Sequence, residues 1–216
     1  MEAWLVSSPY NQVAGTSLER IAALSDGLFA IAMTLIVLEI RLPSPVTIHT
    51  DHALWRALRE LTPRLVTYLM SFLTLGIFWV GQQTQLNLCA RADRNLSWLH
   101  LSFLTGVSTM PFSTKLLAEF IAFRPALIVY WLNLLILGAA LYATWYYAGR
   151  AGLVKEGVPP EIFKAVERRI AVAQGLYASG AALCLINTAW SIGFIVLVQL
   201  NYAIAPRIRF LARLTS

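Results

Sequence analysis

The chain has 216 residues, of which 58% are hydrophobic and 13% are charged, and its formal net charge is +6. Soluble domains carry roughly 45–50% apolar and about 25% charged residues, so this composition excludes an ordinary soluble domain. The apolar residues are grouped in blocks of about 20, the length that crosses ~30 Å of hydrocarbon. The basic residues are spread over short loops rather than gathered on one face, which argues against nucleic-acid binding.

The hydropathy pattern predicts a single-domain, all-α integral membrane protein over residues 1–216, with six transmembrane helices. The expected spans are 18–42, 65–85, 96–115, 125–147, 170–186 and 188–205. A short amphipathic run precedes the second span, a hydrophilic connection precedes the fifth, and a tight turn near Asn187 joins the last two. With both termini inside, the cytoplasmic loops hold eleven of the 17 basic residues and the outer loops hold six. This bias predicts cytoplasmic termini.

The first predicted span contains an ionisable residue, Asp26, and a regular seam of residues. An ionisable residue inside a membrane helix is expensive, so it indicates a functional or structural role. The seam residues follow one another at steps of four and three, the spacing that directs side chains towards an axis shared with neighbouring helices. They are Arg20, Leu24, Gly27, Ile31, Thr34 and Leu38. We expect this face to meet a pore or oligomer axis, and Asp26 to lie on the opposite side as a buried polar anchor.

The start of this span resembles a known signature. Arg20-x-x-x-Leu24-Ser25-Asp26-Gly27, followed by the apolar run 29–35, is similar to the R-x-x-x-F-S-D motif of the transmembrane protein 175 family, the bacterial relatives of a lysosomal potassium channel. Leu24 occupies the position where the family usually has phenylalanine.

The resemblance continues through the second and third predicted spans. The second contains Tyr68-x-x-Ser71-Phe72-x-x-x-Gly76-x-x-Trp79, and the third opens with Asp93 and Trp98 and closes with Pro111-Phe112-Ser113-Thr114. Gln82 and Gln83 stand where a histidine pair is expected. The fourth span is only loosely similar, and the last third of the chain is similar only in hydropathy.

The resemblance implies a six-helix subunit of a bacterial inner-membrane potassium channel, with the first helix of each subunit lining a central pore. The signature occurs once in this chain, and a central pore requires several copies of the helix, so a homo-oligomer is needed. By the family pattern we expect a homotetramer that passes K⁺ and similar monovalent cations. No cofactor and no resident metal are expected.

The predicted constriction consists of Ile31, Thr34, Leu35 and Leu38. The sequence has no T-V-G-Y-G loop, so a filter of backbone carbonyls of that kind is not available. Rings of bulky aliphatic side chains can narrow a pore and gate it by dewetting, and by the family pattern the narrowest ring is Ile31. The Thr34 hydroxyl can offer an oxygen atom to a partly dehydrated K⁺. The alternatives are ordinary helix packing for the seam and a bond from Thr34 to its own helix backbone.

Arg20, Ser25, Asp26 and Trp79 are expected to be structural residues rather than ion ligands. Ser25 and Asp26 would bond to polar groups of neighbouring helices, such as Trp79 or Asn95, and fix the first helix against its own subunit. Arg20 is expected at the inner mouth, where it either bridges subunits or shapes the cytoplasmic vestibule.

The remaining polar patterns are weak. His49 and His52, with Asp51 between them, favour a surface loop over a metal site. His100 is expected to be a packed histidine, with proton sensing as the alternative. Cys89 and Cys184 are interpreted as small apolar fillers.

No catalytic constellation is visible in the sequence, so we do not expect an enzyme. Three alternatives to a potassium channel remain open: a secondary transporter, a proton leak pathway and a non-conducting structural membrane protein. The first would usually show internal repeats and a broken helix at mid-membrane, and neither is visible here.

Overall fold

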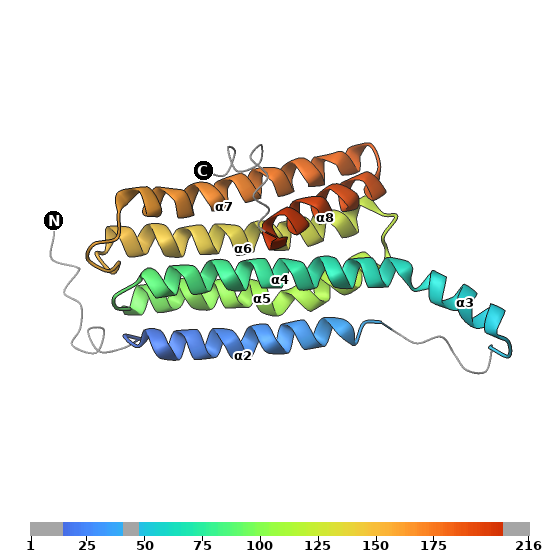
Figure 1. Cartoon of the computed structure of the whole chain (residues 1–216), viewed down its shortest axis with the longest axis horizontal. Helices are drawn as coiled ribbons and strands as arrows, with labels where there is room; N and C mark the ends of the chain where they lie inside the picture. Colours follow the sequence, from blue (N-terminus) through green and yellow to red (C-terminus); the bar gives the residue numbers. More distant parts are fainter. Residues whose placement is uncertain (1–14, 41–47, 205–216) are drawn as a thin grey trace.

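The computed structural model describes residues 15–40 and 48–204, which form a bundle of long helices (Figure 1). In Figure 1, α2, α4, α5, α6 and α7 run alongside one another, with α2 at one edge of the bundle and α7 at the opposite edge. The helices are α2 (Leu18–Val37), α3 (Asp51–Glu60), α4 (Thr62–Leu88), α5 (Arg94–Glu119), α6 (Arg124–Arg150), α7 (Pro160–Ala182), the short 3₁₀ helix η2 (Leu183–Leu185) and α8 (Thr188–Ile204).

Three of these helices, α2, α4 and α6, are long and apolar enough to cross a membrane, and α8 is a shorter apolar helix. Helix α5 is long but rich in serine and threonine. Most of these hydroxyls donate to carbonyls three or four residues earlier in the same helix, as Ser102 does to Trp98 and Thr105 to Leu101. Such bonds satisfy hydroxyl groups where no water is present. The six-span count stays a prediction.

Two expected span ends do not coincide with helix ends. Helix α2 ends at Val37, five residues before Leu42, in a turn that leads to Glu39. The carboxylate of Glu39 pairs with Lys115 at 3.2 Å, so the polar end of the segment is held by an ion pair rather than by further helix. Residues 41–47 lie outside the described part of the chain.

Helix α7 begins at Pro160, ten residues before the expected residue 170. Proline suits the first turn of a helix because it has no backbone N–H to satisfy. Hydropathy missed this first half because it carries several charges, while its apolar face still packs on α6. There the ring of Phe163 stacks on that of Trp145 with centroids 4.8 Å apart. The last turn agrees with expectation, since Asn187 accepts a bond from the backbone of Ala189 and caps α8.

The core lies between α2, α4, α5 and α6 and is aromatic at its centre. The ring of Phe103 is fully buried and contacts the rings of Phe29, Phe78 and His100 at centroid distances of 6.0, 6.3 and 5.9 Å. Each of these rings comes from α2, α4 or α5. These contacts therefore hold α2 to the bundle.

A second buried cluster is polar and is centred on Tyr130 of α6. Its hydroxyl lies 3.0 Å from the hydroxyl of Thr74 and 3.4 Å from that of Ser71, both on α4. Gln199 of α8 donates to Thr74 at 2.7 Å, and Thr114 of α5 donates to Ser71 at 2.7 Å. Interhelical bonds of this kind join membrane helices where hydrophobic attraction between them is absent. The network ties α8 to the bundle.

The connection between α6 and α7 packs against the loop between α4 and α5. Lys155 donates its backbone N–H to Leu88, and Ala90 donates to Leu153. Cys89 is buried in this contact, and its burial raises the pKa of the thiol to about 11, against a smaller lowering by Lys155. The thiol therefore stays protonated at neutral pH. This environment agrees with the interpretation of Cys89 as an apolar filler.

Candidate pore-lining helix and its anchor

Helix α2 buries one narrow face and exposes the rest. Its four buried residues are spaced by four, three and four positions and face α4 and α5, the helices that α2 contacts. They are Ser25, Phe29, Ala32 and Ile36. This spacing is the stripe with which an edge helix packs on a bundle.

The predicted seam lies on the exposed side. Ile31 is 58% exposed, Leu35 45% and Leu38 71%, and Thr34 is also exposed. At about 100° per residue, the seam is roughly opposite the buried stripe. Packing within the subunit therefore does not explain these aliphatic residues. The subunit presents an apolar ridge that only lipid or other copies of the chain can cover.

The structure places Thr34 beside Ile31 on this exposed side. Its hydroxyl donates to the backbone carbonyl of Ile31 at 2.8 Å, which is the local bond considered as the alternative for this residue. A hydroxyl that donates its single hydrogen keeps two lone pairs on its oxygen. The backbone bond therefore leaves the oxygen of Thr34 able to face a cation.

Asp26 connects α2 to α4. One carboxylate oxygen accepts hydrogen bonds from Trp79 Nε1 and from Gln83 Nε2, each at 2.8 Å. The expected contact with Trp79 is confirmed, whereas Asn95 is not a partner, because it donates to the hydroxyl of Tyr147. Two N–H donors on one carboxylate oxygen hold this helix pair by charge-assisted bonds.

The expectation of a buried Asp26 is wrong. Asp26 is exposed on the flank of α2, and the neighbouring Ser25 is the fully buried polar residue. Successive residues of a helix point about 100° apart, so these two cannot both face the centre of the bundle. Ser25 takes the inward position against α5, and Asp26 turns towards the edge of α4.

Ser25 and Gln82 both reach His100 of α5. The hydroxyl of Ser25 lies 3.0 Å, and the amide nitrogen of Gln82 2.8 Å, from Nε2 of His100. A single ring nitrogen therefore lies within hydrogen-bond distance of side chains from both α2 and α4. Within residues 15–40 and 48–204, Nδ1 of His100 has no hydrogen-bond partner. His100 is thus a packed, hydrogen-bonded histidine at the junction of three helices.

His100 agrees with the expectation of a packed histidine, whereas the contacts of Gln82 with His100 and of Gln83 with Asp26 were not predicted from the sequence. The available signal was the spacing of Trp79 and Gln83, four positions apart and therefore on one face of α4. Gln82 and Gln83 replace an expected histidine pair, which put the polar contacts at these two positions in doubt. Both amides nevertheless make such contacts, Gln82 with His100 and Gln83 with Asp26.

Arg20 lies near the beginning of α2 and is exposed on the seam side. With Leu24, Ser97 and His100 it lines an open groove of about 440 Å³ between α2 and α5. The groove places Arg20 at the end of the ridge formed by the seam.

Comparison with known proteins gives the family. Residues 20–111 match the sequence model of a family described as the endosomal/lysosomal potassium channel TMEM175. The chain is 31% identical over 189 residues to potassium channel Cha6605_3372 of Chamaesiphon minutus, with 86% of this chain and 93% of that protein aligned. The chain belongs to the TMEM175 family. The recognition made from its R-x-x-x-L-S-D motif is confirmed.

Other members of the TMEM175 family agree with this assignment. Potassium channel B446_29190 of Streptomyces collinus is 37% identical over 137 residues, which span 62% of this chain and 65% of that protein. The endosomal/lysosomal proton channel TMEM175 of Gallus gallus is 31% identical over 109 residues, which span 48% of this chain and 22% of that protein.

A solved structure shares the fold. The crystal structure of a lysosomal potassium-selective channel TMEM175 homolog from Chamaesiphon minutus superposes with a TM-score of 0.76 at 29% identity, covering 87% of this chain and 97% of that chain. The TMEM175 family is a family of ion channels, so membership supports a multi-pass membrane protein that is not an enzyme.

Proposed function

We propose that this protein is a potassium-permeable cation channel that assembles as a homotetramer, with α2 of each subunit around a central pore. The observation that carries the proposal is the exposed seam of α2. The seam lies roughly opposite the face that packs on the subunit, and its aliphatic residues Ile31, Leu35 and Leu38 are 45–71% exposed. Two bacterial relatives that are named potassium channels support the choice of ion.

Conduction would depend on stacked rings of side chains from four subunits. Ile31 forms the narrowest ring, and Leu35 and Leu38 form further layers towards the outer end. Such rings thin the hydration shell of an ion and close the pore by dewetting when it narrows. The Thr34 hydroxyl oxygens lie next to the Ile31 ring and offer coordination to a partly dehydrated cation. K⁺ is favoured because it releases its water more readily than Na⁺ does.

The same proposal fixes the arrangement in the membrane. Six spans, formed by α2 and α4 to α8, bring both termini to the cytoplasmic side of a bacterial inner membrane. The sequence-based count supports this orientation, since it assigns eleven of the 17 basic residues to the cytoplasmic side when the terminal regions and the charged first half of α7 are included. Arg20 then lies at the cytoplasmic mouth of the pore.

Cation flux from liposomes tests the proposal. The purified protein is reconstituted with K⁺ or Na⁺ gradients, and Ile31→Asn is compared with the wild type. Ile136→Asn is the matched control, because Ile136 lies on α6 and is 55% exposed, close to the 58% of Ile31. We expect Ile31→Asn to accelerate flux or abolish its selectivity, Thr34→Val to lower the K⁺/Na⁺ permeability ratio, and Ile136→Asn to change neither.

Three outcomes would count against this mechanism. Unchanged conductance and selectivity in both Ile31→Asn and Thr34→Val would remove the constriction from α2. Saturating, ion-coupled flux would indicate a transporter, and no flux from folded tetramers would favour a structural protein. A proton leak, the second candidate, is favoured by the relative named a proton channel. A pH-sensitive dye in the same liposomes detects it directly.

A further inference from the structure

A cavity lies between α4, α6, α7 and α8, on the side of the bundle away from α2. Its volume is about 140 Å³, and one side of it is open. Much of its lining is apolar, from residues such as Ile77, Val80, Leu141 and Ile170, and among the described residues Arg169 is the one charged residue in it. A cavity of ~150 Å³ holds a benzene molecule in an engineered protein, so this space fits part of a chain-like ligand rather than a whole lipid.

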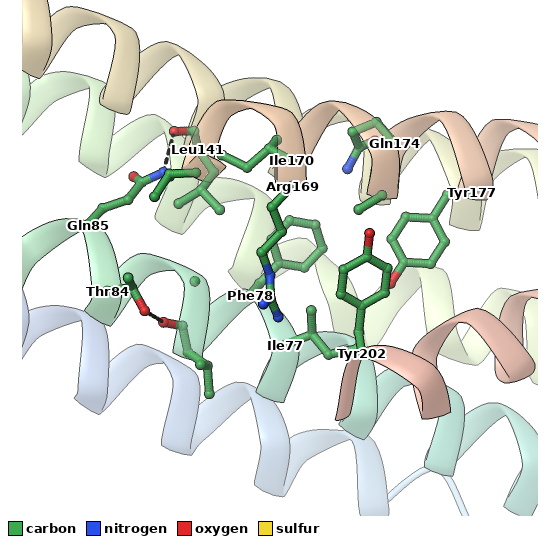
Figure 2. A pocket seen from close by; sticks show the side chains of 14 residues that line it. Ile77, Phe78, Thr84, Gln85, Leu141, Arg169, Ile170, Gln174, Tyr177 and Tyr202 are labelled. Atoms are coloured by element: carbon green, nitrogen blue, oxygen red, sulfur yellow. Dashed lines mark hydrogen bonds between the residues drawn. The ribbon is translucent and has the colours of Figure 1, made fainter. Parts of the chain in front are cut away.

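Arg169 lines this space and has no carboxylate partner within the described part of the chain. It lies nine residues into α7, about 14 Å along the helix from Pro160. Figure 2 shows its side chain reaching from α7 towards α4, beside the ring of Tyr202. Its guanidinium carbon is 5.2 Å from the centroid of that ring, and no acidic side chain in the described ranges lies within ion-pair distance of it. Arg169 is exposed, so an anion from outside the protein can reach its guanidinium. A cation that the protein does not neutralise indicates a functional site in a membrane protein.

Residues with unpaired polar atoms come from three helices and line the same cavity. The hydroxyls of Tyr177 and Tyr202, and the amide oxygens of Gln85 and Gln174, have no hydrogen-bond partner among the described residues. Tyr177 is 1% exposed, Gln85 3% and Tyr202 8%, so bulk water does not reach them freely. Both amide nitrogens are already used, since Gln85 donates to Leu141 and Gln174 to Leu134.

Buried polar atoms without partners are costly and rare, and four around one cavity require an explanation. Tyrosine hydroxyls can donate to an anion, while amide oxygens accept only from hydroxyl or N–H groups. The cavity therefore offers one cation, two hydroxyl donors and two acceptors beside an apolar wall. This set is complementary to a phosphate that carries a hydroxylated head group and an acyl chain.

We propose that this cavity binds an anionic phospholipid, with the phosphate at Arg169, the head-group hydroxyls near the two glutamines, and a segment of one acyl chain along the apolar wall. Around a membrane-spanning bundle, phospholipid is the abundant source of both the anion and the chain. A lipid at this position joins α7 and α8 to α4. The proposal does not depend on conduction by the channel.

Lipid retention in native mass spectrometry tests this proposal on the full-length protein. The protein is delipidated, incubated with phosphatidylglycerol or phosphatidylcholine, and compared with Arg169→Gln. Arg168→Gln is the matched control, since Arg168 is the adjacent exposed arginine of α7 and does not line the cavity. Because a charge-assisted contact is lost, we expect Arg169→Gln to bind phosphatidylglycerol about tenfold more weakly than the wild type. Arg168→Gln should bind it as strongly as the wild type.

A second variant separates a lipid site from a site filled by water or by a free anion. Tyr177→Phe removes an unpaired hydroxyl, so in lipid-free detergent its melting temperature should equal or exceed that of the wild type. With phosphatidylglycerol added, its stabilisation should be smaller than that of the wild type.

Three results would overturn the proposal. Equal loss of phosphatidylglycerol in Arg168→Gln and Arg169→Gln would indicate only general surface charge. Equal stabilisation by phosphatidylcholine would remove the role of the anion, and equal stabilisation by inorganic phosphate alone would assign the site to a free anion instead of a lipid.

Discussion

The anchor of α2 leads to a quantitative prediction, because Asp26 accepts two bonds from α4 through a single oxygen. The perturbations are Asp26→Ala, Trp79→Phe and the double variant. Interhelical hydrogen bonds in membrane proteins contribute about 0.6 kcal/mol on average and about 1.7 kcal/mol at most. A charged acceptor places both bonds in the upper part of this range. The bonds at 2.8 Å from Trp79 and Gln83 therefore predict a loss of about 2 kcal/mol for Asp26→Ala.

Trp79→Phe removes one of the two bonds together with some ring packing. A double-mutant cycle separates these two effects, because in the Asp26→Ala background only the packing is left to lose. We expect a coupling energy of about 1 kcal/mol between positions 26 and 79. Trp98→Phe is the control, since Trp98 is an exposed tryptophan on α5, whereas the donors to Asp26 lie on α4.

The assay is unfolding by sodium dodecyl sulfate in mixed micelles, followed by far-UV circular dichroism so that loss of tryptophan fluorescence does not affect the signal. The free energy of unfolding is measured for each member of the cycle. Additive effects of Asp26→Ala and Trp79→Phe, with a coupling energy near zero, would refute the claim that this contact holds α2. A coupling of equal size with Trp98→Phe would show that the cycle reports a general change of the fold.

Three further predictions concern the packing of the bundle. A Cβ atom at Gly138 would overlap the side chain of Gln174, so Gly138→Ala should lower the free energy of unfolding by about 1–3 kcal/mol through overpacking. A Cβ atom at Gly175 would point into open space, so Gly175→Ala should be neutral or stabilising in the same unfolding assay. Tyr130→Phe should cost about 1 kcal/mol, because the hydroxyls of α4 lose their partner on α6. Burial raises the pKa of the Cys89 thiol to about 11, so a maleimide should not label the folded protein below pH 9 and should label it once the protein is denatured.

Part of the site could be predicted from the sequence because it depends on local periodicity. The seam and the buried stripe of α2 follow from a spacing of three and four residues, which is set within one helix. The contact between Asp26 and Trp79 was also accessible, since an acidic residue in a membrane helix requires a polar partner on a neighbour. Most helix bounds agree with the expected spans to within a few residues for the same reason.

The contacts that depend on the relative position of two helices could not be predicted. His100 pairs with Ser25 because α2 and α5 cross at that level, and no pattern within either segment specifies the crossing. The first half of α7 was missed because its charges hide it from a hydropathy profile. The cavity around Arg169 likewise requires four helices to be placed together, since each of its polar residues is unremarkable within its own segment.

The orientation of the seam follows from residues that do not belong to it. Ser25 and Asp26 are adjacent and point about 100° apart, so their bonds to α5 and α4 lie on either side of the groove in which α2 packs. A rotation of the helix by one residue would break both contacts and bury a carboxylate. The two polar residues thus fix the rotation of α2 and, with it, the direction in which Ile31 points. Gln83 takes part in this role through an amide donor, which explains why a glutamine serves at a position where a histidine was expected.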